Sequence, residues 1–174
     1  VKVCTVIGFP LGATSSESKA YETEIAILQG ADEVDMVINV GAMKNNKTDS
    51  VENDILSVVN SARKTGKTQN KNIIVKVILE TCYLSEDEKV ACTLAAARAK
   101  ANFVKTSTGF GTGGALVTDV VTMKANITPD MEVKASGGIK TLEDALTMIK
   151  VGATRIGTSS GIAIIEAYNQ QEGE

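Results

Sequence analysis

Charged residues follow β-branched residues in several short apolar runs of this chain. The pairs are Val34-Asp35, Val75-Lys76, Val104-Lys105, Val133-Lys134 and, with a glycine in the same place, Ile156-Gly157. Strand side chains alternate between faces, so a shared register would direct the acid and the three amines toward one interior. Charges in buried strands are costly unless they are paired or used. The pattern therefore predicts a site that holds one carboxylate and three amines.

Lys105 and Lys134 carry the main chemical signal, because they occupy the same register on consecutive predicted strands. Two amines that face each other lower each other's pKa, and burial lowers it further. A lysine that is neutral near pH 7 can attack an aldehyde or ketone and form a Schiff base, and a neighbouring cation is one way to prepare it. The alternative for either lysine alone is a strand-end side chain that extends into solvent.

Asp35 is the candidate acid of this site. As a catalytic group it would relay protons and balance the charge of the second amine. The alternative is a simple ion pair with the lysines. We expect Lys76 to give electrostatic support and Glu80 to be structural.

Two glycine-containing turns predict a phosphate site. Ser136-Gly137-Gly138 follows the strand of Lys134, and 157–161 follows the next strand and precedes a short apolar helix at Ile162–Ala167. Glycines let backbone N–H groups approach an anion, and a helix N-terminus adds its dipole. The alternative is two ordinary turns with a serine cap. The phosphate-binding candidates are Gly137, Gly138, Ser159 and Ser160.

One motif points elsewhere, since Gly109–Gly114 matches the G-x-G-x-x-G pattern of dinucleotide-binding proteins. That pattern requires a strand running into the first glycine and an acid that closes the following strand. Here Thr106-Ser107-Thr108 intervenes, and Asp130 lies in a turn before its strand. We therefore expect no nicotinamide cofactor.

Composition excludes several other classes. The 174 residues are 43% hydrophobic, which is enough for one domain with a substantial core. A net charge of −3 without a basic run gives no sign of nucleic acid or a membrane surface, and no apolar stretch approaches about 20 residues. The chain has no histidine, which excludes a Ser-His-Asp triad and histidine zinc sites. Three cysteines without a CxxC motif suggest reduced thiols and a cytoplasmic location.

Strand and helix patterns alternate along the chain. Predicted strands are Val3–Ile7, Glu33–Ile38, Ile73–Leu79, Asn102–Thr106, Glu132–Ala135 and Thr154–Thr158. Three predicted helices have these apolar stripes: Val51, Ile55, Val58 and Ala62; Val90, Leu94, Ala97 and Ala101; Leu142, Ala145, Leu146 and Ile149. Predicted capping boxes are Ser85 with Glu88, Thr14 with Glu17 and Thr141 with Asp144, and Gly30 and Gly152 are placed to end helices.

This alternation predicts a parallel α/β fold, either doubly wound or a (β/α)₈ TIM barrel. The barrel is favoured because several strands contribute polar residues to a common centre. Six strand–helix units are visible whereas closure takes eight, so we expect an open barrel from which the two N-terminal units are missing. We assign residues 1–168 to a single incomplete barrel domain and 169–174 to a polar C-terminal tail.

Several segments resemble 2-deoxyribose-5-phosphate aldolases, a class I aldolase family with a (β/α)₈ barrel. They are Cys4–Gly12, Ala31–Asp35, Val75–Thr81, Val104–Gly109, Lys134–Gly138 and Gly157–Ser160. The resemblance implies that Lys105 forms the Schiff base, Lys134 perturbs it and Asp35 relays protons, with the glycines and serines named above on the phosphate. It implies no metal or organic cofactor, because the protonated imine is the electron sink. The family also has two further strand–helix units upstream, with another site aspartate, which the printed sequence lacks.

The resemblance implies reversible cleavage of 2-deoxyribose 5-phosphate to glyceraldehyde 3-phosphate and acetaldehyde, a step in deoxyribonucleotide catabolism. The expected partners are a small sugar phosphate and an aldehyde, in a homo-oligomer. One alternative is another Schiff-base aldolase or a transaldolase that acts on a different sugar phosphate. Another is a phosphosugar-binding barrel without catalysis, in which the lysines only neutralise a ligand.

Overall fold

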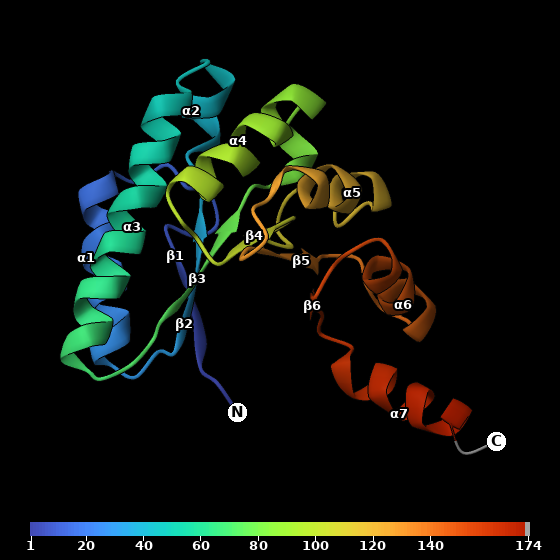
Figure 1. Cartoon of the computed structure of the whole chain (residues 1–174). Helices are drawn as coiled ribbons and strands as arrows, with labels where there is room; N and C mark the ends of the chain where they lie inside the picture. Colours follow the sequence, from blue (N-terminus) through green and yellow to red (C-terminus); the bar gives the residue numbers. More distant parts are fainter. Residues whose placement is uncertain (173–174) are drawn as a thin grey trace.

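The computed structural model describes residues 1–172 and contains one sheet of six parallel strands (Figure 1). The strands pair in chain order from β1 to β6, as expected for successive strand–helix units. All six lie within one residue of the predicted bounds. They are β1 (Cys4–Ile7), β2 (Glu33–Val37), β3 (Ile74–Ile78), β4 (Phe103–Lys105), β5 (Glu132–Ser136) and β6 (Arg155–Gly157).

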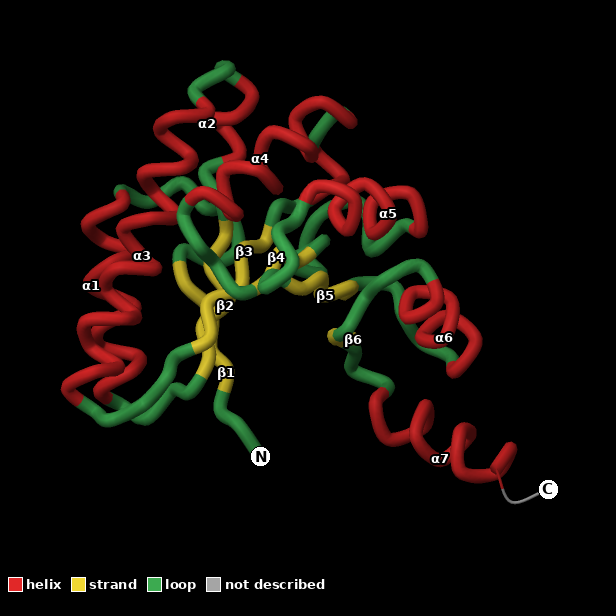
Figure 2. Tube along the Cα trace, in the orientation of Figure 1, coloured by secondary structure: helices red, strands yellow, loops and turns green. Residues whose placement is uncertain are grey.

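Helices follow every strand and lie outside the curl of the sheet (Figures 1 and 2). Within residues 1–172 no strand pairs with the outer edge of β1 or β6, so the fold is a curled half-barrel, as predicted. The helices are α1 (Ser16–Leu28), α2 (Val40–Lys44), α3 (Thr48–Thr68), α4 (Glu86–Arg98), α5 (Val117–Asn126), α6 (Leu142–Lys150) and α7 (Gly161–Glu172), with a 3₁₀ turn, η1 (Thr81–Tyr83).

The apolar core lies between the sheet and these helices. On the sheet side it includes Val34, Val75, Val104 and Val133, the β-branched residues that precede the charged ones. The predicted stripe of α3 is confirmed, since all four of its residues are fully buried. Because strand side chains alternate, burying these valines outward turns the charged residues toward the concave face.

The other two predicted stripes are wrong in part. In α4 the buried face carries Cys92, Ala95 and Ala96 while Leu94 is 40% exposed, because alanines surround this helix and do not mark one face. In α6, Ala145 and Met148 are buried. Leu146 and Ile149 instead line an open apolar groove between α6 and α7.

Helix ends mostly agree with the capping signals. The boxes at Ser85 and Thr141 are both present. Helix α1 is capped by Ser15 rather than Thr14, because the adjacent serine can accept the same backbone N–H. Residues 169–172 of the expected tail continue α7, since polar residues such as glutamine favour a helix, and 173–174 lie outside the described residues. None of the helices in the described part of the chain is long and apolar enough to cross a bilayer.

Candidate active site

The four charged candidates lie on the concave face, in two adjacent rows. Asp35 is opposite Lys76 in the pairing of β2 with β3, and Lys105 is opposite Lys134 in the pairing of β4 with β5. Between these pairs the register shifts, because Lys105 lies opposite Ile78 rather than Lys76. The shift is by two residues, so it preserves the face on which each side chain lies.

Asp35 is the centre of this cluster. Its Oδ2 accepts hydrogen bonds from Lys105 Nζ at 2.9 Å and Lys134 Nζ at 2.7 Å, and its Oδ1 accepts one from Lys76 Nζ at 2.8 Å. The residue is only 2% exposed. Burial opposes ionisation, but the charges and hydrogen bonds of Lys105 and Lys134 outweigh it and hold the pKa of Asp35 well below its usual range. Asp35 is therefore an anion that accepts hydrogen bonds from three amines.

The pKa shifts of Lys105 and Lys76 go in opposite directions. Burial is the main cause that lowers the pKa of Lys105; the charge of Lys134 lowers it further and Asp35 opposes the shift. Burial also acts against the charged form of Lys76, but hydrogen bonds to Asp35 and Glu33 outweigh it and raise the pKa of Lys76. Lys76 is thus a stable cation, whereas Lys105 releases its proton more readily and is the better nucleophile.

Gly157 provides the space that Lys134 needs. A Cβ atom at this position would lie 3.2 Å from Lys134 Cε and 2.7 Å from Ser136 Cβ. Any larger residue would therefore clash with Ser136 and press on the side chain of Lys134. This explains why a glycine occupies the place that a charged residue takes on the other strands.

The predicted phosphate turns meet at a cavity of about 370 Å³ next to Lys105. Gly137 and Gly138 have φ angles of +86° and +79°, which favour glycine, and a Cβ at Gly138 would point into open space. Ser160 is not among the lining residues, and its backbone N–H is bonded to Thr158 Oγ1. The lining residues are Lys105, Thr108, Gly109, Ser136, Gly137, Gly138, Ile139, Lys140, Gly157, Thr158 and Ser159.

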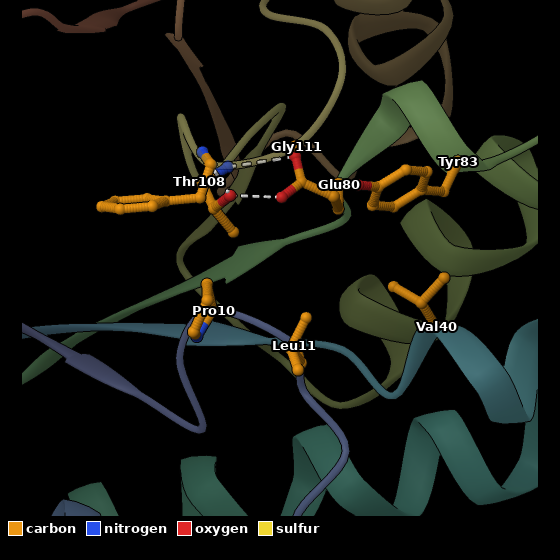
Figure 3. A pocket seen from close by; sticks show the side chains of 8 residues that line it. Pro10, Leu11, Val40, Glu80, Tyr83, Thr108 and Gly111 are labelled. Carbon is orange, nitrogen blue, oxygen red and sulfur yellow. Dashed lines mark hydrogen bonds between the residues drawn. The ribbon is translucent and has the colours of Figure 1, made fainter.

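Thr108 separates this cavity from a more apolar one of about 210 Å³. Figure 3 shows the Glu80 carboxylate facing Thr108, which donates to it through both its backbone N–H and its hydroxyl. Glu80 is buried with φ +55°, a left-handed conformation that is unusual outside glycine. Glu80 thus has the structural role expected of it: it holds the loop that follows Lys105 through its hydrogen bonds with Thr108. The second cavity is lined by Pro10, Leu11, Val40, Glu80, Tyr83, Thr108, Phe110 and Gly111.

Two of the three glycines of the G-x-G-x-x-G segment are explained by close packing around this loop. A Cβ at Gly111 would meet Cys82 Sγ at 2.9 Å and Glu80 Cδ at 3.1 Å. A Cβ at Gly114 would lie 2.3 Å from the carbonyl oxygen of Gly137. Close packing against η1 and the turn at Gly137 therefore requires small residues at these two positions.

Three residues near the lysines were missed from sequence. Glu33 Oε2 accepts from Lys76 Nζ at 2.5 Å and from Arg155 Nη1 at 3.2 Å. Cys4 Sγ lies 3.2 Å from Asp35 Oδ1, and burial, followed by the charge of Asp35, raises the pKa of this thiol. Glu33 could have been found, because it precedes Asp35 by two residues and so shares its face.

A cluster of this kind, beside a glycine-lined cavity, suits an aldehyde that carries an anionic group. The sequence matches a family model described as DeoC/LacD family aldolase over residues 2–167. It is 56% identical over 166 residues to the deoxyribose-phosphate aldolase of Carboxydothermus hydrogenoformans, covering 95% of this chain and 71% of that protein. It is 55% identical over 172 residues to that of Thermococcus gammatolerans, covering 99% and 74%.

Solved structures agree with these matches. An aldolase named QR15 superposes with a TM-score of 0.89 at 41% identity, covering 99% of this chain and 74% of that one. A tetrameric deoxyribose phosphate aldolase from Aeropyrum pernix superposes with a TM-score of 0.85 at 34% identity, covering 98% and 69%. Since the family model spans nearly the whole sequence and the relatives share more than half of their aligned residues with it, the chain belongs to the DeoC/LacD family of aldolases.

Proposed function

We propose that this aldolase cleaves 2-deoxy-D-ribose 5-phosphate reversibly to D-glyceraldehyde 3-phosphate and acetaldehyde, through a Schiff base on Lys105. The relatives named above are deoxyribose-phosphate aldolases, which supports the substrate. The observation that carries the mechanism is that Lys105 and Lys134 donate to the same oxygen of Asp35. Two amines on one buried oxygen make loss of a proton from one of them easier, and Lys105 is the one that borders the glycine-lined cavity.

The first half of the reaction forms the iminium ion. Neutral Lys105 Nζ attacks C1 of the open-chain aldehyde, giving a carbinolamine. Protonation of its hydroxyl, with Lys134 as the nearest donor, releases water and leaves a positively charged imine. This cation draws electrons from the substrate, so the chemistry needs no metal or organic cofactor.

The second half breaks the carbon–carbon bond. A base removes the proton of the C3 hydroxyl, through Asp35, Lys134 and a water molecule, and the C3–O bond becomes the carbonyl of glyceraldehyde 3-phosphate. The C2–C3 electron pair moves to form the C2=C1 bond of an enamine, which neutralises the iminium nitrogen. Protonation at C2 and hydrolysis then return Lys105 and release acetaldehyde.

The phosphate of the substrate would bind the backbone N–H groups of Gly137 and Gly138 and the side of the cavity formed by Ser159. Both glycines line this cavity with positive φ angles, and the space beside Gly138 is open. For Ser160 we propose only an indirect role, because its N–H already has a partner in Thr158.

Two further assignments belong to this proposal. A homo-oligomer is supported by the tetrameric relative from Aeropyrum pernix. The cytoplasmic location stays a prediction from the cysteine content.

The direct test is cleavage of 2-deoxyribose 5-phosphate, followed by enzymatic detection of glyceraldehyde 3-phosphate. Lys105→Met should abolish product formation, whereas Lys150→Met, at the exposed end of α6, should leave it near the parent level. A parent chain that binds the sugar phosphate without releasing glyceraldehyde 3-phosphate would favour the non-catalytic phosphosugar-binding protein.

A further inference from the structure

Glu33 lies directly next to the cluster formed by Asp35, Lys105 and Lys134. Its side chain pairs with Lys76 and Arg155 rather than with Lys105 or Lys134. It precedes Asp35 by two residues on β2, so its side chain enters the same concave face one row away. The residue is 6% exposed. Its Oε2 atom accepts from Lys76 Nζ at 2.5 Å and from Arg155 Nη1 at 3.2 Å. A carboxylate buried so deeply needs partners of this kind to remain ionised.

Lys76 connects Glu33 to Asp35. Its Nζ lies between Glu33 Oε2 and Asp35 Oδ1, and its side chain is fully buried. The two carboxylates hold this ammonium group in one position. Asp35 Oδ1 is thereby engaged, and Oδ2 is the oxygen that receives Lys105 and Lys134.

The charge cluster around Asp35 and Glu33 contains more basic groups than acids, although the Arg155 side chain is 44% exposed. Glu33 and Asp35 on β2 face Lys76 on β3, Lys105 on β4, Lys134 on β5 and Arg155 on β6, and the Cys4 thiol on β1 also contacts Asp35. Without Glu33, one acid would face all four basic groups. The electrostatic potential at Lys105 therefore depends on Glu33 even though the two side chains do not touch.

We propose that Glu33 is a positioning residue for the aldolase reaction: it fixes Lys76 against Asp35 Oδ1 and balances the Lys76 charge, so that Asp35 Oδ2 is reserved for Lys105 and Lys134. This inference rests on the proposed Schiff base at Lys105. Glu33 acts through Lys76 and Asp35 and needs no contact with substrate.

The proposal predicts opposite effects for two substitutions. Glu33→Gln keeps the shape of the side chain but removes a negative charge, so the potential becomes more positive and the pKa of Lys105 falls further. Lys76 stays charged in this variant, because Asp35 still accepts from it. Lys76→Met removes a positive charge, so the pKa of Lys105 rises. Because Glu33 and Lys76 belong to the same charge cluster as Lys105, each substitution should shift the pKa of Lys105 by about 0.5 to 1.

The experiment measures the rate at which acetaldehyde and cyanoborohydride ethylate Lys105 as a function of pH. Relative to the parent, the midpoint of this rate profile should move to lower pH in Glu33→Gln and to higher pH in Lys76→Met. Glu132→Gln is the matched control, since Glu132 precedes Lys134 by two residues on β5 but is exposed. Its midpoint should equal that of the parent.

The double variant Glu33→Gln/Lys76→Met completes the test. It removes a buried pair of opposite charges together, which proteins tolerate better than the loss of one partner, so it remains informative if Glu33→Gln does not fold. Its midpoint should return close to that of the parent. Midpoints that do not move, or a double variant that keeps the Lys76→Met midpoint, would overturn the role of Glu33. Failure of the parent to form any adduct on Lys105 would instead reject the proposed function.

Discussion

The residue that organises the site is Asp35, because one of its oxygens receives two amines while the other receives a third. An arrangement with a single acceptor for two potential cations favours the state in which one of them is neutral. A second carboxylate, that of Glu33, keeps Lys76 charged, so the neutral amine is either Lys105 or Lys134. The burial of Lys105, together with the neighbouring charge of Lys134, favours Lys105 as the nucleophile.

Gly138→Ala should impair phosphate recognition specifically. Its φ of +79° and the open space beside it mean that a methyl group would strain the backbone and enter the cavity. We expect KM for 2-deoxyribose 5-phosphate to rise about tenfold or more, with little change for unphosphorylated deoxyribose, since a lost hydrogen bond to a charged group costs about 1.5–3 kcal/mol.

Gly30→Ala is the matched control for this prediction. Gly30 also has a positive φ and free space around it, but it lies at the end of α1, in the turn before β2. Backbone strain should lower stability in both variants by about 1–2 kcal/mol. Equal losses on the two substrates in Gly138→Ala would contradict a phosphate site here.

At the residue scale, much of the site could be predicted from sequence, because alternation along a strand determines the face of each side chain. Asp35, Lys76, Lys105 and Lys134 were found in this way. Loop residues were found only in part. Gly137, Gly138 and Ser159 line the cavity as the turn signals suggested, but no periodicity places Thr108 beside Lys105 or removes Ser160 from the lining. The contact of Glu80 with Thr108 likewise depends on the left-handed backbone conformation of Glu80, which the sequence does not predict.

At the scale of elements, a buried ion pair connects α1 and α3 to the end of β2. Lys19 is fully buried, and its Nζ donates to Asp54 Oδ2 at 2.5 Å and to the carbonyl oxygen of Val37 at 2.9 Å. Its aliphatic stem lies against Gly8, where a Cβ would come within 2.7 Å of Lys19 Cε. The pair therefore supports the loop that carries Pro10 and Leu11 to the second cavity.

Lys19→Met should destabilise the protein by about 3–5 kcal/mol, because it leaves the carboxylate of Asp54 buried without its cation. Urea unfolding followed by circular dichroism measures this. The exposed pair of Lys44 with Glu88 is the control, and Lys44→Met should cost less than about 1 kcal/mol. Similar losses of unfolding free energy in the two variants would show that burial does not determine how much an ion pair contributes to stability.

Elements were predicted with uneven success for a physical reason. Each strand contains valine or isoleucine, which strongly prefer the extended conformation, and the strand bounds were correct to one residue. The face of α4 was wrong because its alanines pack equally well on any side. Its buried face even includes Lys89, which is paired with Asp119 across to α5. Pairing allows both residues to be buried, but a hydropathy pattern counts each of them as polar.

At the scale of the whole molecule, charges on the concave face link strands that are distant in the sheet. Arg155 on β6 reaches Glu33 on β2, and Lys134 on β5 reaches Asp35 on β2. These contacts cross the curl and are independent of backbone pairing. The open sheet and its order were predictable from the number of strand–helix units, whereas these cross-sheet contacts depend on the curvature.

Stability should therefore fall in acid as this network is protonated. The folded-state pKa of Asp35 lies below its unfolded value, so its contribution is present above the ordinary carboxyl pKa and is lost as pH falls from about 5. Asp35→Asn should be about 3–5 kcal/mol less stable than the parent at pH 7. This difference should be smaller by about 1 kcal/mol at pH 3 and should shrink further below pH 3, as the folded-state pKa of Asp35 is approached. Urea unfolding at a series of pH values tests this, and a difference that is constant with pH would contradict it.

The most direct measurement for the whole account is to treat the protein with acetaldehyde and borohydride and to locate the ethyl group by peptide mass spectrometry. The account predicts a single adduct on Lys105, formed in the parent chain and absent from Lys105→Arg. An adduct on Lys134 or Lys76, or no stable adduct at all, would contradict it.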